Sequence, residues 1–439
     1  MKYAFRLTSW CLLYLSLVIV PLILAALGPF PAGRGFWREF AVAVGFVGLA
    51  MWGLEFALVA RMRPIAAPFG EDAIIWFHEL LGYFGTFFVL LHPFLLIVAV
   101  NSNFINLLNP FTASPTGQTG TISILLVLVL VATSIWRSQL RIPYEWWQAT
   151  HALLATVAVL LALWHLELVG RYVQDWKRVL WALMTLAFIG IIGWVRIVRP
   201  IQRIRRPWEV EGVSAEPGRS WTVTLRPVGH PGFAYAPGEF GWLSVNRSPF
   251  SLTQHPFSFS SSPERQGRIQ MTIKELGDFT RTVGSIAPGT RAYLDGPHGT
   301  FSPDRYEGPG FALLAAGIGI APMMSMLRTF ADRADPRPSF LFYANRHVED
   351  ALFEDELEAL KQKLALVVVH VVSQPPDGWP GERGRINAEL LGRYLPTTGR
   401  QRLQCFICGP EQFQDSMVVA LSSLGVPGER IHTERFNWV

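Results

Sequence analysis

The sequence predicts a membrane-embedded bundle of six helices, followed by an antiparallel β-barrel domain and an α/β doubly wound domain. Three observations support this prediction. Long apolar runs are confined almost entirely to residues 1–200, short strand-like segments begin after 207, and strands alternate with helical stretches from 310 onward. We expect the domains to span 1–206, 207–305 and 306–439.

Composition excludes several classes of protein. Half of the 439 residues are hydrophobic and only 16% are charged, whereas about a quarter of a soluble protein is charged. The net charge is +5, but the basic residues gather at the ends of apolar segments, which argues against a nucleic-acid partner. The three cysteines, Cys11, Cys405 and Cys408, cannot form a disulfide framework. Cys405 and Cys408 have CxxC spacing, but no second such pair completes a zinc site.

Six apolar segments of about 20 residues are long enough to cross a bilayer as helices. They lie near 8–27, 40–60, 73–100, 121–140, 146–168 and 179–198. A signal peptide is the alternative interpretation of the first segment, but its apolar run is longer than a usual signal core, so we expect a retained helix.

Basic residues at the segment ends set the expected orientation. Most of them share one side of the membrane if all six segments cross, which predicts cytoplasmic termini and a cytoplasmic soluble half. We expect the membrane to be a plasma membrane of bacterial type. The bias is incomplete, because the opposite side holds Arg34, Arg38, Arg171, Lys177 and Arg178. The basic run 196–206 is suited either to contact with anionic membrane lipid or to bracing the soluble half.

Four histidines lie in the apolar segments, two on the third and two on the fifth. His78 and His92 are fourteen positions apart, as are His151 and His165. Fourteen helical residues turn about 1,400°, close to four full turns, so both rings of a pair project from one face about 21 Å apart. The two segments run in the same direction, so His78 is expected to face His151 and His92 to face His165.

Two facing imidazoles are suited to the axial positions of a haem iron. Two layers of them predict two haems stacked across the bilayer. The alternative is that each histidine is a satisfied polar residue between helices, which the identical spacing of the two pairs disfavours.

The soluble half contains two regions with different patterns of apolar residues. Segments 221–228, 239–245 and 268–276 have the pattern of short strands and predict an antiparallel barrel over about 208–300. Buried parallel strands are expected at 310–317, 339–346, 364–373 and 402–409. Helices are expected near 321–333, 350–362, 387–395 and 411–424, which completes a nucleotide-binding pattern.

Two stretches of the soluble half are suited to phosphates. In "GIGIAP", Gly317 and Gly319 permit close approach of a pyrophosphate to the helix that follows, with Pro322 in place of a last glycine. A tight strand-to-helix turn is the alternative. In "KELGDFT", Lys274 and Thr280 offer a cation and a hydroxyl to a diphosphate.

Two further stretches are suited to a flavin. In "HPFSFSSSP", Ser258 and Ser260 lie on one side of an extended segment, where their hydroxyls can hydrogen-bond a flavin edge beside Phe257. The terminal "HTERFNWV" places Phe436 where it can stack on a ring or pack on its own domain.

In this order along the chain, the two H-x13-H helices, HPFS, GDFT, DGPHG, GIGIAP, CGPEQF and the aromatic C-terminus resemble the ferric reductase and NADPH oxidase superfamily. The resemblance covers almost the whole chain, and the soluble half is also similar to ferredoxin–NADP reductases. It implies a transmembrane oxidoreductase that uses NADPH or NADH, FAD and two haem b groups.

The resemblance also implies roles for individual residues. An inner haem would bind His78 and His151, and an outer haem His92 and His165. The matching FAD residues are His255, Pro256, Phe257, Ser258, Lys274 and Thr280. The matching nicotinamide-nucleotide residues are Gly317, Gly319, Pro322, Cys408, Gly409 and Pro410. Phe436 matches the terminal aromatic that stacks on the isoalloxazine. Arg346 and Arg385 are candidates for a 2′-phosphate, which favours NADPH over NADH.

The final electron acceptor is less determined. The form HPFS and Arg38, which corresponds to an arginine before the second helix of some oxidases, favour O2 reduction to superoxide. Leu96 stands where other oxidases have a further histidine, so reduction of an extracytoplasmic ferric chelate stays open. Electron donation to a periplasmic protein is a third possibility, although the short outer loops offer no docking domain and no obligate protein partner is expected.

Overall fold

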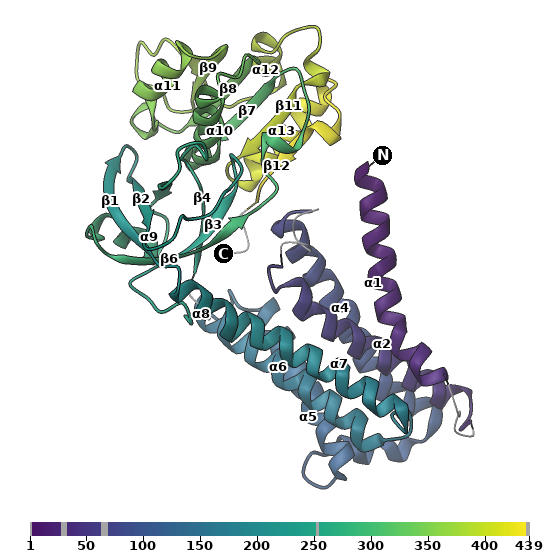
Figure 1. Cartoon of the computed structure of the whole chain (residues 1–439). Coiled ribbons are helices and arrows are strands. Elements are labelled where there is room, and N and C mark those ends of the chain that lie inside the picture. The colour runs from purple at the N-terminus through teal and green to yellow at the C-terminus, as the bar shows by residue number, and fades with distance from the viewer. Residues whose placement is uncertain (1, 28–32, 63–68, 252–253, 436–439) are drawn as a thin grey trace. The chain divides into compact units, whose positions relative to one another are not determined.

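The computed structural model describes residues 2–27, 33–62, 69–251 and 254–435, and the chain divides into two compact units (Figure 1). The helical unit comprises Met1–Pro68 and Ala73–Arg199. The sheet unit comprises Phe69–Asp72 and Pro200–Val439.

The helical unit contains six helices that are long and apolar enough to cross a membrane, within the described ranges. These helices are α1 (Lys2–Ala26), α2 (Phe36–Leu58), α4 (Glu71–Leu95), α5 (Pro115–Ile135), α6 (Tyr144–Val169) and α7 (Trp176–Gly193). Helix α4 continues as a π-helical turn, Leu96–Val100, and α7 continues through a second one, Trp194–Val198, into α8 (Arg199–Ile204). The six predicted segments correspond to these helices in order.

The fourth segment differs from its predicted bounds of 121–140, because α5 spans Pro115–Ile135. Its start is set by Ser114, whose Oγ accepts a hydrogen bond from the Gly117 amide at 3.4 Å, and by Pro115 in the first turn. Residues before it are also helical, since Ser102–Leu108 forms a 3-10 helix. Hydropathy alone missed these polar helical residues.

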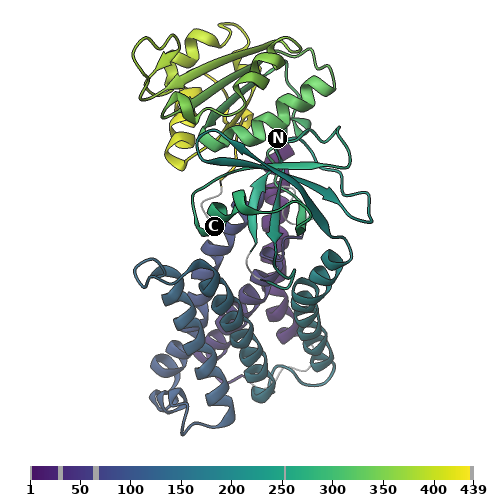
Figure 2. The ribbon, with the colours of Figure 1, turned by 90° about the vertical axis from the view of Figure 1, so that its left-hand side faces the viewer.

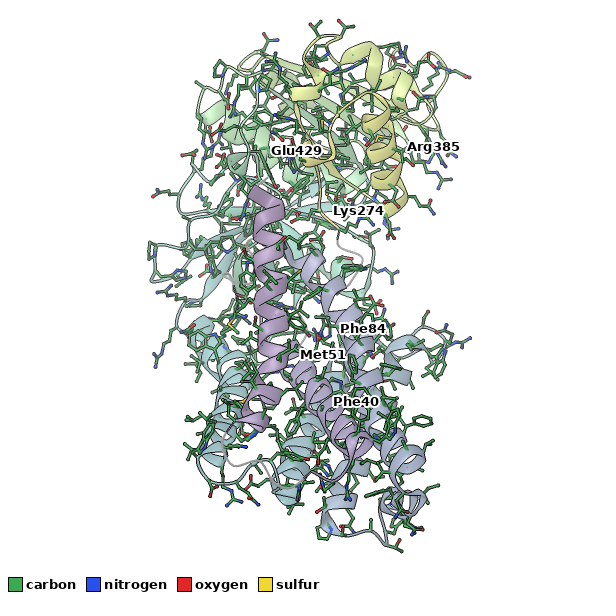
Figure 3. The ribbon with its side chains drawn as sticks, turned by 90° about the vertical axis from the view of Figure 1, so that its right-hand side faces the viewer. Phe40, Met51, Phe84, Lys274, Arg385 and Glu429 are labelled. Carbon is green, nitrogen blue, oxygen red and sulfur yellow. The ribbon has the colours of Figure 1, made fainter. Side chains whose placement is uncertain are left out.

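Small residues let α2 and α4 pack closely. A Cβ added to Gly48 would meet Val89 Cγ2 at 2.6 Å, and one added to Gly85 would meet Trp52 Cδ1 at 3.0 Å. Large apolar side chains cover the outside of the helices instead. Phe40 and Phe84 are exposed on this outer surface, whereas Met51 is buried (Figure 3).

The first sheet of the sheet unit is antiparallel, with strand order β4-β3-β6-β1-β2-β5. Its strands are β1 (Trp208–Glu216), β2 (Ser220–Pro227), β3 (Phe240–Val245), β4 (His255–Ser258), β5 (Ile269–Lys274) and β6 (Arg291–His298). A bridge between Phe259 and Met271 joins the two edges of the sheet, and the Ser260 amide donates to the Gln270 carbonyl at 2.8 Å. The sheet therefore closes into a barrel.

The second sheet is parallel, with order β10-β9-β8-β7-β11-β12. Its strands are β7 (Phe311–Ala316), β8 (Ser339–Asn345), β9 (Leu366–Val372), β10 (Glu382–Arg383), β11 (Gln404–Cys408) and β12 (Ile431–Thr433). Its helices are α10 (Ile320–Asp332), α11 (Glu354–Lys361), α12 (Ala388–Tyr394) and α13 (Glu411–Ser423). The order reverses between β7 and β11, so a ligand site is expected at the carboxyl ends of these two strands.

Helices cover both faces of the parallel sheet (Figures 1 and 2). Along β7 the side chains alternate between two cores. Phe311, Leu313 and Ala315 face α10 and α11, whereas Ala312 and Leu314 face α12 and α13. Both faces are buried, as the continuous apolar strand predicts.

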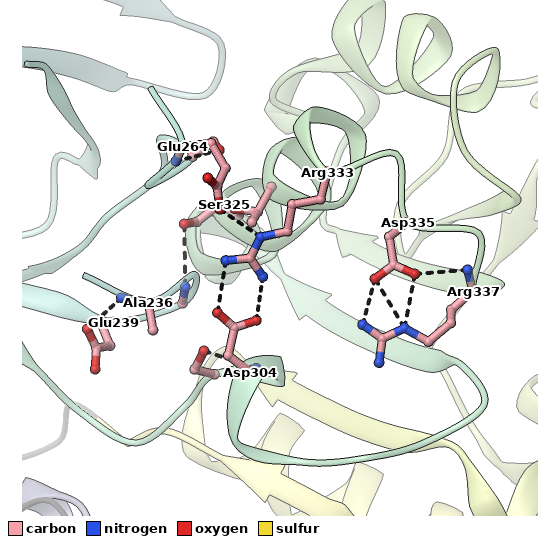
Figure 4. Close-up of polar contacts among 12 residues, drawn as sticks. Ala236, Glu239, Glu264, Asp304, Ser325, Arg333, Asp335 and Arg337 are labelled. Carbon is pink, nitrogen blue, oxygen red and sulfur yellow. Dashed lines mark hydrogen bonds and ion pairs between the residues drawn. The ribbon is translucent and has the colours of Figure 1, made fainter. Parts of the chain in front are cut away.

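Helix α10 also fastens the α/β domain to the barrel. Arg333, just past its end, forms ion pairs with Asp304 and Glu264, each with a closest N–O distance of 2.7 Å (Figure 4). Ser325 donates from its Oγ to the Ser261 carbonyl at 2.7 Å. The two domains of the sheet unit are thus held together along one helix, and the amino end of that helix follows the glycine turn.

Candidate functional site

The four membrane histidines form two facing pairs in the helical unit. The ring centres of His78 on α4 and His151 on α6 are 6.3 Å apart, and their planes are inclined by 71°. The ring centres of His92 and His165, on the same two helices, are 6.5 Å apart with an inclination of 77°. This is the pairing that the fourteen-residue spacing predicts.

Helix α2 supplies a partner for each histidine of α4. The Nδ1 atom of His92 lies 2.8 Å from the Ala41 carbonyl oxygen. The Nδ1 atom of His78 is hydrogen-bonded to the carboxylate of Glu55, which is itself buried. Because a carbonyl only accepts, the proton of His92 is on Nδ1, and its Nε2 keeps a free lone pair.

Helix α5 does the same for the histidines of α6. The Nδ1 atom of His165 lies 2.8 Å from the Thr116 carbonyl oxygen, and that of His151 lies 3.2 Å from Ser134 Oγ. The Ser134 hydroxyl donates to the Leu130 carbonyl at 2.8 Å, so its oxygen is available to accept from the ring. All four rings therefore direct Nε2 away from their supporting helices.

Two glycines make room for these contacts. A Cβ on Gly45 would lie 2.9 Å from His92 Nδ1, and a Cβ on Gly120 would lie 3.0 Å from His165 Nδ1. Each glycine stands one helical turn after the residue whose carbonyl accepts from the ring. The sequence analysis identified neither glycine, nor Glu55 or Ser134, as part of the site.

The paired rings fit a haem iron. A metal–imidazole bond of about 2 Å plus about 1 Å to the ring centre, counted on both sides, gives a separation of about 6 Å, which matches the 6.3 and 6.5 Å found here. Among the described residues, no group of three or more His, Cys, Asp and Glu side chains is arranged to hold a bare metal ion. Two imidazoles per layer suit an iron whose other ligands come from a macrocycle.

Near the start of α2, Arg38 lies over the Phe104 ring, 5.2 Å from its centre. Arg34 donates from Nη2 to the Tyr172 hydroxyl at 3.0 Å and pairs with Glu39 at 3.5 Å. Leu96, which stands where some oxidases have a further histidine, begins the π-helical turn after α4.

In the barrel, the HPFS and GDFT segments meet through their aromatic rings. His255 stacks on Phe279 with ring centres 4.2 Å apart and planes within 9°, and Phe257 lies 6.1 Å from the same ring. Pro256 pairs with Trp242 across β3 and β4, and Ser258, at the end of β4, is buried. The stack, which the sequence did not reveal, gathers the rings of His255, Phe257 and Phe279 on one side of the segment.

The two residues expected near a diphosphate already have protein partners. Thr280 Oγ1 accepts hydrogen bonds from the amides of Leu276 and Gly277, both at 2.8 Å, and so caps the short helix α9 (Asp278–Thr282). Lys274, labelled in Figure 3, lies 3.9 Å from an Asp350 carboxylate oxygen. Both remain beside the turn, where a bound diphosphate would compete for them.

At the reversal point of the parallel sheet, the two glycine turns are in contact. Gly317 has a φ of 53°, a conformation that favours glycine, and Gly319 leaves no room for a Cβ against the Cys408 carbonyl. Pro322 is buried in the first turn of α10, and Gly409 and Pro410 lead into α13. Amides at the start of α10 are therefore available to an anion.

The Cys408 thiol is buried at the end of β11. Burial, with a smaller contribution from the nearby Glu434 charge, raises the pKa of this thiol. It is therefore a neutral group rather than a thiolate at neutral pH.

The two arginines expected near a 2′-phosphate lie on the side of the sheet formed by β8, β9 and β10. Arg346 follows β8 and donates from Nε to Gln374 Oε1 at 3.2 Å. Arg385 is exposed just past β10 (Figure 3). Both follow the carboxyl ends of their strands.

The expected stacking residue Phe436 lies outside the described residues, but the chain just before it carries a polar group that sequence reasoning missed. Glu434 is buried, and burial, together with the nearby carboxylates, raises its pKa well above the ordinary value. It follows β12, a strand that was not predicted and that pairs with β11. Nothing in the sequence around Glu434 indicated that this side chain is buried or that β12 precedes it.

A buried ionic cluster inside the sheet unit was also missed. His298, in the DGPHG segment, places Nδ1 2.5 Å from Glu71 Oε1 and Nε2 3.5 Å from Asp295 Oδ1. Asp295 also pairs with Arg203 of α8. Burial lowers the pKa of His298, but contacts with Asp295 and Glu71 outweigh it and raise the pKa above its usual value.

Comparison with known families matches three models along the chain. Residues 44–162 match the ferric reductase like transmembrane component, residues 220–299 an FAD-binding domain, and residues 313–418 an oxidoreductase NAD-binding domain.

Individual relatives match about half of the chain. Sulfhydrogenase 1 subunit gamma of Pyrococcus furiosus is 30% identical over 45% of this chain and 67% of its own length. The ferredoxin reductase component of a 3-ketosteroid-9-alpha-monooxygenase from Rhodococcus rhodochrous is 30% identical over 47% of this chain and 57% of its own length. Among solved structures, a ferredoxin reductase in carbazole 1,9a-dioxygenase is 26% identical, covers 53% of this chain and 69% of its own, and has a TM-score of 0.47.

The three family models occur in one chain, in the order membrane component, FAD domain and NAD domain. Such a chain passes electrons from NAD(P)H through FAD to a membrane component. The protein therefore belongs to the ferric reductase and NADPH oxidase superfamily and is an integral-membrane oxidoreductase.

Proposed function

We propose that the helical unit carries two haem b groups, one between His78 and His151 and one between His92 and His165. Electrons from cytoplasmic NADPH would cross the membrane through FAD and these two haems, and O2 on the far side would be reduced to superoxide. The observation that carries this proposal is the use of every Nδ1 by a neighbouring helix, which leaves two facing pairs of Nε2 atoms.

The cofactors would supply the redox chemistry, FAD taking a hydride and releasing single electrons and the haem irons accepting one each. The chain binds, orients and insulates them. Amides at Gly317–Gly319 and the start of α10 would hold the dinucleotide pyrophosphate. The neutral Cys408 thiol would lie beside the nicotinamide without adding charge. The stacked His255 and Phe279 rings would support the flavin.

The orientation and the choice of coenzyme follow from charge. The basic ends of the helices favour a cytoplasmic sheet unit. Arg346 and Arg385 favour a 2′-phosphate, so NADPH should be preferred over NADH. Arg346→Ala and Arg385→Ala should lower kcat/KM for NADPH more than for NADH, and an equal loss with both coenzymes would count against this role.

The acceptor is proposed to be O2 because Arg38, at the start of α2, offers a positive charge to a superoxide product. A ferric chelate is the second candidate. The cations Arg34, Arg38 and Arg171 share the expected outer side, and a positive surface attracts anionic chelates.

The purified chain supplied with NADPH should reduce cytochrome c in a reaction that superoxide dismutase inhibits. Dismutase-insensitive reduction of chelated ferric iron without O2 consumption would support the second candidate. Failure with both acceptors would favour a partner protein. Haem content tests the ligands directly, because His92→Ala should remove about half of the bis-imidazole signal, and an unchanged signal would refute the ligand assignment.

A further inference from the structure

The four histidine supports are not equivalent. His92 and His165 each contact a backbone carbonyl, and His151 contacts the neutral hydroxyl of Ser134. His78 alone, within the described residues, is supported by an acid, Glu55. One of the two layers therefore has a carboxylate against its ligand, and the other has none.

Burying the Glu55 carboxylate costs free energy at this position. It lies within the apolar helix α2 with 7% of its surface exposed, and its Oε1 atom has no hydrogen-bond partner among the described residues. The nearby Tyr14 hydroxyl, also buried, has none either. A carboxylate in a membrane helix that is only half satisfied lowers stability, so packing gives no account of why an acid is present.

The contact has a defined chemical consequence. With iron at Nε2, His78 would carry its remaining proton on Nδ1 and donate a hydrogen bond from it to the Glu55 carboxylate. A carboxylate acceptor makes the imidazole a more basic ligand. Its negative charge, in a medium of low dielectric, also favours the more positive oxidised iron. Both effects lower the reduction potential of the layer that contains His78.

We propose that Glu55 is a positioning residue that sets the potential of the His78–His151 layer below that of the His92–His165 layer. Each transfer between the layers would move one electron, oxidising Fe(II) to Fe(III) in the His78–His151 layer and reducing Fe(III) to Fe(II) in the His92–His165 layer, while His78 keeps its Nδ1 proton. The step between the layers then runs downhill, away from the His78 side. This inference rests on the two haem sites of the proposed function.

A potentiometric titration of the purified full chain, followed by haem absorbance, tests it. The wild type should show two midpoints whose equilibrium constants differ at least tenfold, which is ~59 mV for one electron. Glu55→Gln keeps a hydrogen-bonding side chain but removes the charge. It should raise only the lower midpoint, by a similar ~59 mV. Glu79→Gln is the matched control, because it removes the same charge beside His78 from an exposed residue that contacts Tyr83.

The outcomes are separable. A wild type with fewer than two haems would refute the proposed function itself. Two haems with one shared midpoint, or a shift of equal size in Glu79→Gln, would overturn the role of Glu55. If Glu55→Gln does not fold, His92→Ala decides, since the haem that it retains must titrate at the lower wild-type midpoint and a match to the higher one refutes the inference. Glu55→Asp, which keeps the charge, should leave the lower midpoint near its wild-type value.

Discussion

Replacing Gly45 by alanine should disable one layer of the histidine site and leave the other intact. The added Cβ would lie 2.9 Å from His92 Nδ1, and ordinary contacts begin at 3.4 Å. The ring must therefore retreat by about 0.5 Å, the whole tolerance of a working ligand geometry. Its 2.8 Å contact with the Ala41 carbonyl would also lengthen past the usual limit of about 3.2 Å.

Loss of such a supporting contact weakens metal binding by about 10- to 100-fold, which is about 1.4–2.8 kcal/mol. Helix propensity acts in the opposite direction, because alanine stabilises a helix by about 1 kcal/mol relative to glycine. We therefore expect a folded protein that loses the haem proposed for the His92–His165 layer on purification, measured as haem per chain and as the number of midpoints.

Gly53→Ala is the matched control for Gly45→Ala. It is on the same helix, and its added Cβ would meet nothing within 4 Å. It should keep two haems. Gly120→Ala should behave like Gly45→Ala, because its Cβ would lie 3.0 Å from His165 Nδ1. Two haems with wild-type midpoints in both Gly45→Ala and Gly120→Ala would refute the reasoning.

Three further predictions concern the sheet unit. Because the pKa of His298 is raised, its ion pairs stabilise the folded protein fully below about pH 6.5, and this contribution is lost as pH rises through the folded pKa. His298→Gln should lower the free energy of unfolding by about 3–5 kcal/mol and flatten its pH dependence in calorimetry. An unflattened profile would contradict this. Arg333→Ala should destabilise the junction between barrel and α/β domain by about 1 kcal/mol, whereas Arg337→Ala, whose partner Asp335 is two residues away (Figure 4), should leave domain-separating proteolysis unchanged. Burial raises the pKa of Cys405 to about 12, so iodoacetamide at pH 8 should leave it unmodified in the folded chain and label it after denaturation, and labelling without denaturation would contradict its burial.

Periodicity predicted much of this architecture, because it reports which face of an element is buried. The spacing of His78 and His92 fixed a common helix face, and the continuous apolar run of β7 indicated a strand covered on both sides. The bounds of α5 were wrong where polar residues begin the helix. Ser114 and Pro115 carry the relevant start signal, but hydropathy does not register it.

The supports of the histidines were predicted less well, for a physical reason. Ala41 and Thr116 act through backbone carbonyls, which every residue has, so no side-chain pattern marks them. Glu55 did carry a signal, since an ionisable residue within an apolar helix is costly and suggests function. The stack of His255 on Phe279 joins segments that only the closed barrel brings together.

The helices of the bundle divide the work of the site between them. Helices α4 and α6 carry the four imidazoles, while α2 orients those of α4 and α5 orients those of α6. In the His92–His165 layer the two supports are built alike, with an accepting carbonyl and a glycine four residues later. The His78–His151 layer departs from this plan, because side chains of different charge, Glu55 and Ser134, replace the carbonyls. A site built only to tolerate buried histidines would need no such difference, whereas a carboxylate beside one layer alone would set the potentials of the two proposed haems apart.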